Sequence, residues 1–102
     1  MTGLLMSEAD FQKRVTDYAT LRGWRWVHIR PARTAHGWTV PYDGDHGLPD
    51  LILSRRSRVL LVELKSARGT ATADQLAWLA ALGEHGRLWT PAHWDDVLED
   101  LR

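Results

Sequence analysis

The chain has 102 residues and a formal net charge of zero, with 44% hydrophobic and 25% charged residues, a composition typical of one ordinary globular domain over residues 1–102. It contains no cysteine, which excludes disulfide frameworks, thiolate metal sites and thiol nucleophiles. No apolar run approaches the roughly 20 residues that span a bilayer, and the first ten residues lack the segments of a signal peptide, so we expect a cytoplasmic protein without a membrane partner.

The charges are distributed unevenly along the chain. From Tyr18 to Tyr42 there is no acidic residue but there are four arginines, and over residues 18–73 nine Lys or Arg residues accompany four acids. The acids concentrate near the C-terminus, at Glu84, Asp95, Asp96, Glu99 and Asp100. This pattern favours one basic and one acidic face, as in nucleic-acid-binding proteins. Scattered, solvated charges are an equally good interpretation.

The first half of the chain predicts a helix, a strand and a loop. Ser7-Glu8-Ala9-Asp10 has the form of a capping box, which predicts a helix over about residues 8–22 that stops at Gly23. "WRWVHIR" alternates as a strand until Pro31 ends it. Residues 31–47 are rich in Gly, Pro, Thr, Asp and His, and we expect a long loop there, which in so small a domain is usually functional or mobile.

The second half predicts a hairpin followed by a helix, a strand and a helix. "DLIL" and "RVLLVELK" are β-type runs joined by the turn "SRRS". Thr72 and Gln75 repeat the capping-box pattern before an apolar helix that stops near Gly83. "GRLWT" then reads as a strand and "HWDDVLEDLR" as an amphipathic helix. We therefore predict an α/β fold with a mixed central sheet flanked by helices, in the order α-β-β-β-α-β-α.

Three charged residues stand at the open end of the predicted hairpin. Glu63 and Lys65 point to one face of their strand, because strand side chains alternate. An antiparallel pairing around "SRRS" brings Asp50 beside them. Two adjacent carboxylates repel one another, and oxygen ligands of this kind suit Mg²⁺ or Mn²⁺. A structural ion pair between Glu63 and Lys65 is the alternative interpretation.

The motifs resemble a known nuclease superfamily. Pro49-Asp50, followed by Glu63-Leu64-Lys65, is similar to the PD-(D/E)xK signature of restriction-endonuclease-like folds. "SEADFQ", "GLPDLIL", "VELKS" and "ATADQLAWLAALGEHG" resemble the VRR-NUC group, which includes small phage and bacterial nucleases, over roughly residues 7–94. The resemblance implies a metal-dependent DNA endonuclease that is selective for Holliday junctions or other branched DNA, and often a homodimer.

The resemblance also implies roles for particular residues. Asp50 and Glu63 would bind Mg²⁺ or Mn²⁺ with the Leu64 backbone carbonyl, and Glu8 would approach the metal directly or through water. Lys65 would be the catalytic lysine, and Gln75 would complete the site. Glu8 and Gln75 also have purely local interpretations, as a helix-dipole acid and a capping-box partner.

Further residues are candidates for contact with DNA or with a second copy of the chain. Arg30 and Arg33 are expected to contact phosphate, together with His36 and Arg68, and Trp38 could stack on an unpaired base. Trp24, Trp26 and Trp78 are expected in the core, and Trp89 and Trp94 at a dimer interface. The five histidines lack zinc-site spacing. A DNA-binding module without catalytic activity is the alternative function.

Overall fold

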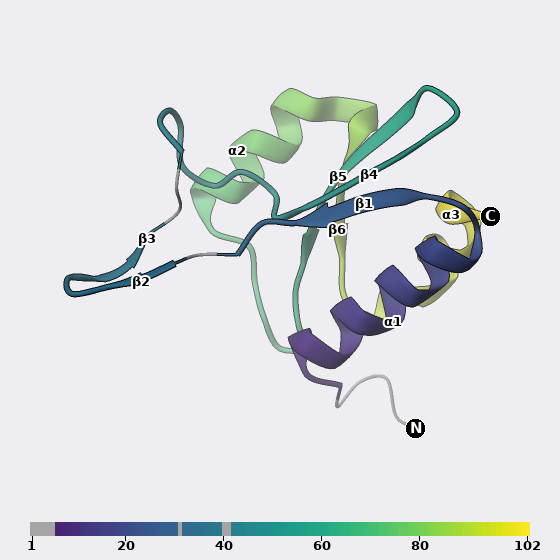
Figure 1. The fold of residues 1–102 in the computed structure, drawn as a ribbon, viewed down its shortest axis with the longest axis horizontal. Coiled ribbons are helices and arrows are strands. Elements are labelled where there is room, and N and C mark those ends of the chain that lie inside the picture. The colour runs from purple at the N-terminus through teal and green to yellow at the C-terminus, as the bar shows by residue number, and fades with distance from the viewer. Residues whose placement is uncertain (1–5, 31, 40–41) are drawn as a thin grey trace.

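The computed structural model describes residues 6–30, 32–39 and 42–102. Figure 1 shows an α/β fold whose strands lie between helices. The longer elements, in chain order, are α1 (Glu8–Leu21), β1 (Arg25–His28), β2 (Ala32–Thr34), β3 (Gly37–Thr39), β4 (Leu51–Arg55), β5 (Arg58–Leu64), α2 (Ala73–Leu82), β6 (Gly86–Trp89) and α3 (Trp94–Leu101). Two 3-10 turns, η2 (Gly83–His85) and η3 (Pro91–His93), precede β6 and α3.

The main sheet is mixed, as predicted. Its strand order is β1-β4-β5-β6, with β1, β4 and β5 antiparallel and β6 parallel to β5. Helix α2 makes the crossover between β5 and β6, because a parallel pair cannot be joined by a tight turn. The hairpin predicted around "SRRS" is present, and its two turn residues, Arg56 and Ser57, both have positive φ, as the tightest β-hairpins require.

The segment predicted as a loop contains a second, separate hairpin. Strands β2 and β3 pair antiparallel, with Thr34 opposite Gly37, and the hairpin extends away from the body of the molecule (Figure 1). The expectation of one long loop over residues 31–47 was therefore wrong for the strands Ala32–Thr34 and Gly37–Thr39. Short β-type runs in "ARTAHGWT" are too weak to stand out from the surrounding Gly and Pro residues.

The core lies on one face of the main sheet. Leu60, Val62 and Leu64 of β5 are buried there against α1 and α3, whereas Val59 and Glu63 point to the opposite face, which α2 partly covers. The remaining members of this core are Phe11, Val15, Ala19, Trp24, Leu51, Leu53, Trp89, Val97 and Leu101. The predicted alternation along β5 is confirmed, and it gives Glu63 a face different from that of the core.

Several tryptophan expectations need correction. Trp24 is in the core as expected. Trp26 is 41% exposed because β1 is an edge strand, and the indole N–H of Trp26 donates to Thr20 Oγ1 at 2.9 Å. Trp78 is only half-buried. Trp89 is 2% exposed within the core, so it cannot lie at a dimer interface. Trp94 is partly buried against the core, and its role at a dimer interface stays a prediction.

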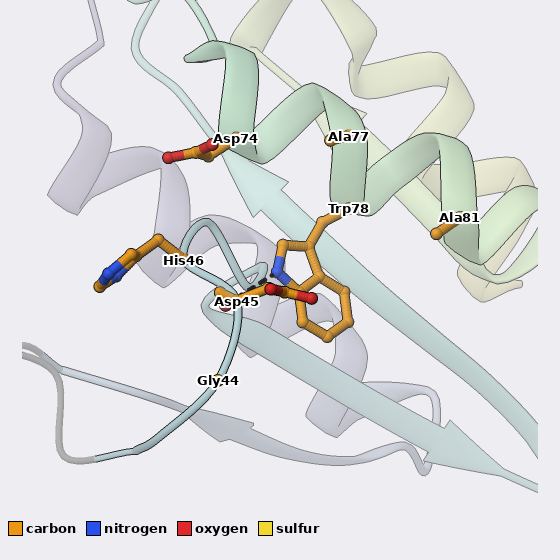
Figure 2. Close-up of a pocket in the computed structure, with 7 residues that line it drawn as sticks. All are labelled: Gly44, Asp45, His46, Asp74, Ala77, Trp78 and Ala81. Carbon is orange, nitrogen blue, oxygen red and sulfur yellow. Dashed lines mark hydrogen bonds between the residues drawn. The ribbon is translucent and has the colours of Figure 1, made fainter.

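Two contacts attach the segment before Asp50 to α2, one at the start of the helix and one near its middle. Trp78 Nε1 donates to the Asp45 carbonyl at 3.2 Å (Figure 2). Gly47, at φ +95°, lies so close to α2 that an added Cβ would be 2.5 Å from the carbonyl carbon of Asp74. Glycine is therefore required here for close backbone approach as well as for its φ. These contacts fix the path by which the chain enters the Asp50 end of the sheet.

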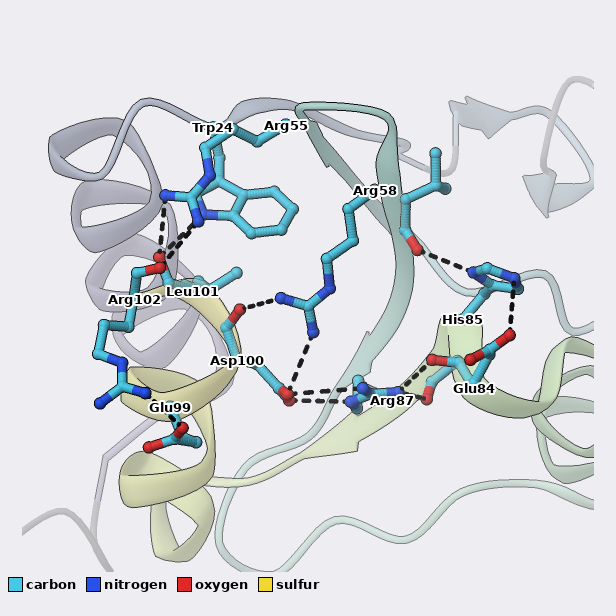
Figure 3. A network of polar contacts seen from close by, with 12 residues as sticks. Trp24, Arg55, Arg58, Glu84, His85, Arg87, Glu99, Asp100, Leu101 and Arg102 are labelled. Carbon is cyan, nitrogen blue, oxygen red and sulfur yellow. Dashed lines mark hydrogen bonds and ion pairs between the residues drawn. The ribbon is translucent and has the colours of Figure 1, made fainter.

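The opposite end of the sheet is fixed by arginines (Figure 3). Arg55 donates to the Arg22 carbonyl at 2.8 Å and to the Leu101 carbonyl at 3.4 Å, while Trp24 Nε1 donates to the same Leu101 carbonyl at 2.9 Å. The carboxylate of Asp100 accepts from Arg87 Nε at 2.8 Å. The arginines thus satisfy carbonyls at the C-terminal ends of α1 and α3, which have no partners within their helices.

Arg55→Met should destabilise the fold, since it removes these hydrogen bonds while preserving most of the apolar stem. A hydrogen bond from a charged group contributes about 1.5–3 kcal/mol. Because these bonds are exposed or only partly buried, we expect a loss near the lower end of that range in urea unfolding. Arg56→Met, at the exposed turn, is the matched control and should have little effect. Equal stability of the two variants would show that Arg55 does not hold the helix ends.

Candidate metal and phosphodiester site

The hairpin brings Asp50, Glu63 and Lys65 together, as predicted. Leu51 of β4 pairs with Val62 of β5, so continuing the register by one residue places Asp50 opposite Glu63. Lys65 follows the end of β5, and its Nζ lies 3.4 Å from Glu63 Oε2. The side chains of Glu63 and Lys65 are 5% and 16% exposed. Three charged groups therefore share a largely dehydrated corner of the sheet.

Asp50 has one carboxylate oxygen paired and the other unpaired. Its Oδ2 lies 3.4 Å from His28 Nε2. Its Oδ1 is buried and has no hydrogen-bond partner in the described part of the chain. Because an unpaired buried acceptor costs about 1–3 kcal/mol, and because native proteins leave few of them, the position of Oδ1 calls for a ligand.

Glu63 is held from two sides through a single oxygen. Oε2 accepts from Gln75 Nε2 at 3.1 Å and pairs with Lys65 Nζ. Over the described residues, no hydrogen bond or ion pair uses Oε1 of Glu63. Each carboxylate of the Asp50–Glu63 pair therefore keeps one oxygen free of protein partners.

The pKa values of both carboxylates are raised. Burial, together with the nearby charge of Asp50, raises the pKa of Glu63 to about 7, although Lys65 opposes the rise. Burial likewise raises the pKa of Asp50, against the opposing effects of His28 and Lys65. Near neutral pH the pair thus resists carrying two negative charges, and a bound cation would relieve that repulsion.

Gln75 combines the two roles considered for it. The side-chain Oε1 of Gln75 accepts from the Thr72 backbone N–H at 2.9 Å. The backbone N–H of Gln75 donates to Thr72 Oγ1 at 3.2 Å, which completes the predicted capping box. The side-chain nitrogen, Nε2, donates to Glu63 Oε2. One side chain therefore closes the start of α2 and fixes the Glu63 carboxylate.

Glu8 has no direct contact with Asp50 or Glu63 among the described residues. It is the first residue of α1 and is exposed, yet its charge contributes to the raised pKa of Glu63. Leu64, whose carbonyl was predicted as a ligand, lies between Glu63 and Lys65 with its side chain in the core. Across residues 6–30, 32–39 and 42–102, no group of three His, Asp or Glu side chains converges. The carboxylates of Asp50 and Glu63 are thus the main candidate ligands.

The predicted DNA-contacting residues do not form one compact cluster. Arg30 is exposed just after β1, His36 is exposed at the turn of the β2–β3 hairpin, and Arg68 is exposed between β5 and α2. The backbones of Arg33 and Trp38 pair within that hairpin, but their side chains lie outside the described part of the structure.

His28 is the site residue that the sequence did not single out. The "WRWVHIR" alternation shows only that His28 shares a face with Trp26. Its contact with Asp50 depends on the pairing of β1 with β4, which places His28 opposite Leu51. A separate surface pocket, seen in Figure 2, is lined by Asp45, Asp74 and Trp78 among others, and includes none of the three charged site residues.

Comparison of the chain with protein-family models, curated proteins and solved structures gave no match. None of the helices within the described residues is both long and apolar enough to cross a membrane.

Glu63→Gln should change the pH dependence of stability when a chelator is present. A folded-state pKa of about 7, against 4.5 for the ordinary group, means that the native protein holds this proton more tightly than the unfolded chain. The contribution of Glu63 to stability should therefore be fully present below pH 4.5 and be lost as pH rises through about 7, by on the order of 3 kcal/mol.

Thermal unfolding followed from pH 4 to 8 provides the measurement. The Glu63→Gln variant lacks this ionisation, so the difference between its melting temperature and that of the unsubstituted protein should shift in favour of the variant as pH rises. Glu84→Gln is the matched control, because the Glu84 side chain is 88% exposed, and its profile should follow the unsubstituted protein. Parallel profiles for all three proteins would mean that Glu63 ionises normally.

Proposed function

We propose that this protein is a metal-dependent DNA endonuclease with a PD-(D/E)xK-type core, related to the VRR-NUC group. The observation that carries the proposal is the pair of adjacent, largely dehydrated carboxylates, Asp50 and Glu63, with Lys65 beside them. Each carboxylate has one oxygen without a partner among the described residues. A structural Glu63–Lys65 ion pair would explain the 3.4 Å contact but would leave the buried Asp50 oxygen without a role.

The donor set fits a hard divalent cation. Asp50 and Glu63 offer carboxylate oxygens, the Leu64 carbonyl is a further candidate ligand, and Glu8, whose charge acts on Glu63, would take part through water, which Mg²⁺ commonly retains in proteins. When bound, Mg²⁺ or Mn²⁺ would supply Lewis-acid chemistry that acidifies water and offsets phosphate charge.

Lys65 and Gln75 prepare the site for a phosphodiester. Lys65 carries a positive charge whose position is restrained by Glu63, so it can stabilise negative charge that develops on a scissile phosphate without reorganisation. Gln75 keeps Glu63 Oε2 engaged, which directs the other carboxylate oxygen away from the protein contacts. Lys65 and Gln75 thus hold a positive charge and a carboxylate in fixed positions, and the phosphate of the substrate would bind beside them.

The DNA contacts of the proposal come from basic residues around this corner. Arg30 leaves the sheet beside Asp50, since the neighbouring Ile29 N–H donates to the Asp50 carbonyl at 2.7 Å. The β2–β3 hairpin that follows projects from the body (Figure 1) and carries Arg33, His36 and Trp38. Selectivity for branched DNA enters the proposal through the resemblance to the VRR-NUC group. A homodimer that cuts two strands belongs to the same proposal.

Incubation with a four-way junction, a flap and plasmid DNA tests the activity. Cleavage should require Mg²⁺ or Mn²⁺, should stop with EDTA, and should fall roughly 10²–10³-fold in Asp50→Asn, Glu63→Gln and Lys65→Met. Lys13→Met is the control for Lys65, because Lys13 pairs with Asp17 on the exposed face of α1.

Cleavage that persists in all three site variants would remove the assigned roles. Binding of these DNAs without cleavage of any of them would instead identify a non-catalytic DNA-binding module.

Gln75→Leu and Thr72→Ala separate the cap from the site. Both substitutions break the capping box and should cost about 1 kcal/mol of stability. Only Gln75→Leu also releases Glu63, so it alone should lower the cleavage rate at a temperature where both proteins are folded. Equal cleavage rates in the two variants would restrict Gln75 to helix capping.

A further inference from the structure

His28 and Asp50 are held side by side by the backbone. β1 pairs with β4 so that His28 lies opposite Leu51, and the Ile29 N–H donates to the Asp50 carbonyl at 2.7 Å. The residues adjacent to both side chains are thus fixed by the sheet. The contact therefore joins the last residue of β1 to the residue just before β4, where the backbones on both sides are hydrogen-bonded to one another.

The contact with His28 uses one carboxylate oxygen of Asp50, Oδ2, and does not use the other, Oδ1. His28 Nε2 lies 3.4 Å from Asp50 Oδ2, and the two side chains are only 18% and 27% exposed. The imidazole thereby restricts rotation of the carboxylate about its Cβ–Cγ bond. With Oδ2 turned to the ring, Oδ1 occupies a buried position without a partner in the described residues.

A purely structural histidine–aspartate pair explains this arrangement poorly. At 3.4 Å the hydrogen bond is longer than the usual 2.7–3.2 Å, so its contribution to fold stability is small. Within the part of the chain that the structure describes, the pair also leaves His28 Nδ1 and Asp50 Oδ1 buried without partners, each at a cost in free energy. An arrangement that costs stability in the absence of a ligand is better explained by a role in binding one.

We infer that His28 is a positioning residue, which holds Asp50 Oδ2 so that Oδ1 is presented to a divalent cation shared with Glu63. The inference rests on the proposed function, and adds to it a residue outside the nuclease motifs. Groups that orient a metal-binding side chain commonly change metal affinity by roughly 10–100-fold when they are removed.

Isothermal titration of the metal-free protein with Mn²⁺, without DNA, tests the inference independently of cleavage. His28→Phe keeps the bulk of the ring but removes the donor, and should weaken Mn²⁺ binding roughly 10–100-fold. His28→Gln, whose amide can donate to Asp50, should restore most of the affinity. His85→Phe is the control, because His85 is 56% exposed and contacts the Val59 carbonyl; it should bind Mn²⁺ as the unsubstituted protein does.

The outcomes distinguish the inference from the function on which it rests. Failure of the unsubstituted protein to bind Mn²⁺ would overturn both. Normal Mn²⁺ affinity in His28→Phe would overturn the positioning role and leave the proposed function standing. Should His28→Phe not fold, His28→Asn replaces it, since its shorter amide cannot reach Asp50. Equal affinity in His28→Gln and His28→Asn would then overturn the inference.

Discussion

The pairing register of β4 and β5 is the constraint on which the rest of the site depends. With Leu51 opposite Val62, the core side chains of both strands face α1 and α3, and the same alternation turns Glu63 to the face that carries α2. A slip of one residue would exchange the two faces along a whole strand. The register therefore couples burial of the core to the meeting of Asp50 with Glu63.

Each end of this hairpin is secured by different chemistry. At the turn end, Arg55 and Trp24 donate to carbonyls of α1 and α3 (Figure 3), and these contacts are structural. At the open end, Asp50 and Glu63 have raised pKa values, and each keeps one oxygen without a partner among residues 6–30, 32–39 and 42–102. The rigid end supplies stability, so the open end can hold repelling charges that would otherwise relax apart.

The features foreseen from the sequence are the local ones. The hairpin, the face of Glu63 and the capping box of Gln75 depend on residues a few positions apart, and alternation and capping rules describe such neighbours well. The Asp50–His28 contact depends on which strand lies beside β4, which no local pattern determines. Trp26 and Trp89 were misplaced for the same reason, since edge position and helix packing decide whether an aromatic ring is exposed.

Diffraction from crystals soaked in Mn²⁺, recorded where manganese scatters anomalously, tests the central claim most directly. The arrangement of the carboxylates predicts an anomalous peak beside Asp50 Oδ1 and within ligand distance of Glu63. A peak elsewhere, or none at this pair at saturating Mn²⁺, would contradict the claim that the two carboxylates are held together for a cation.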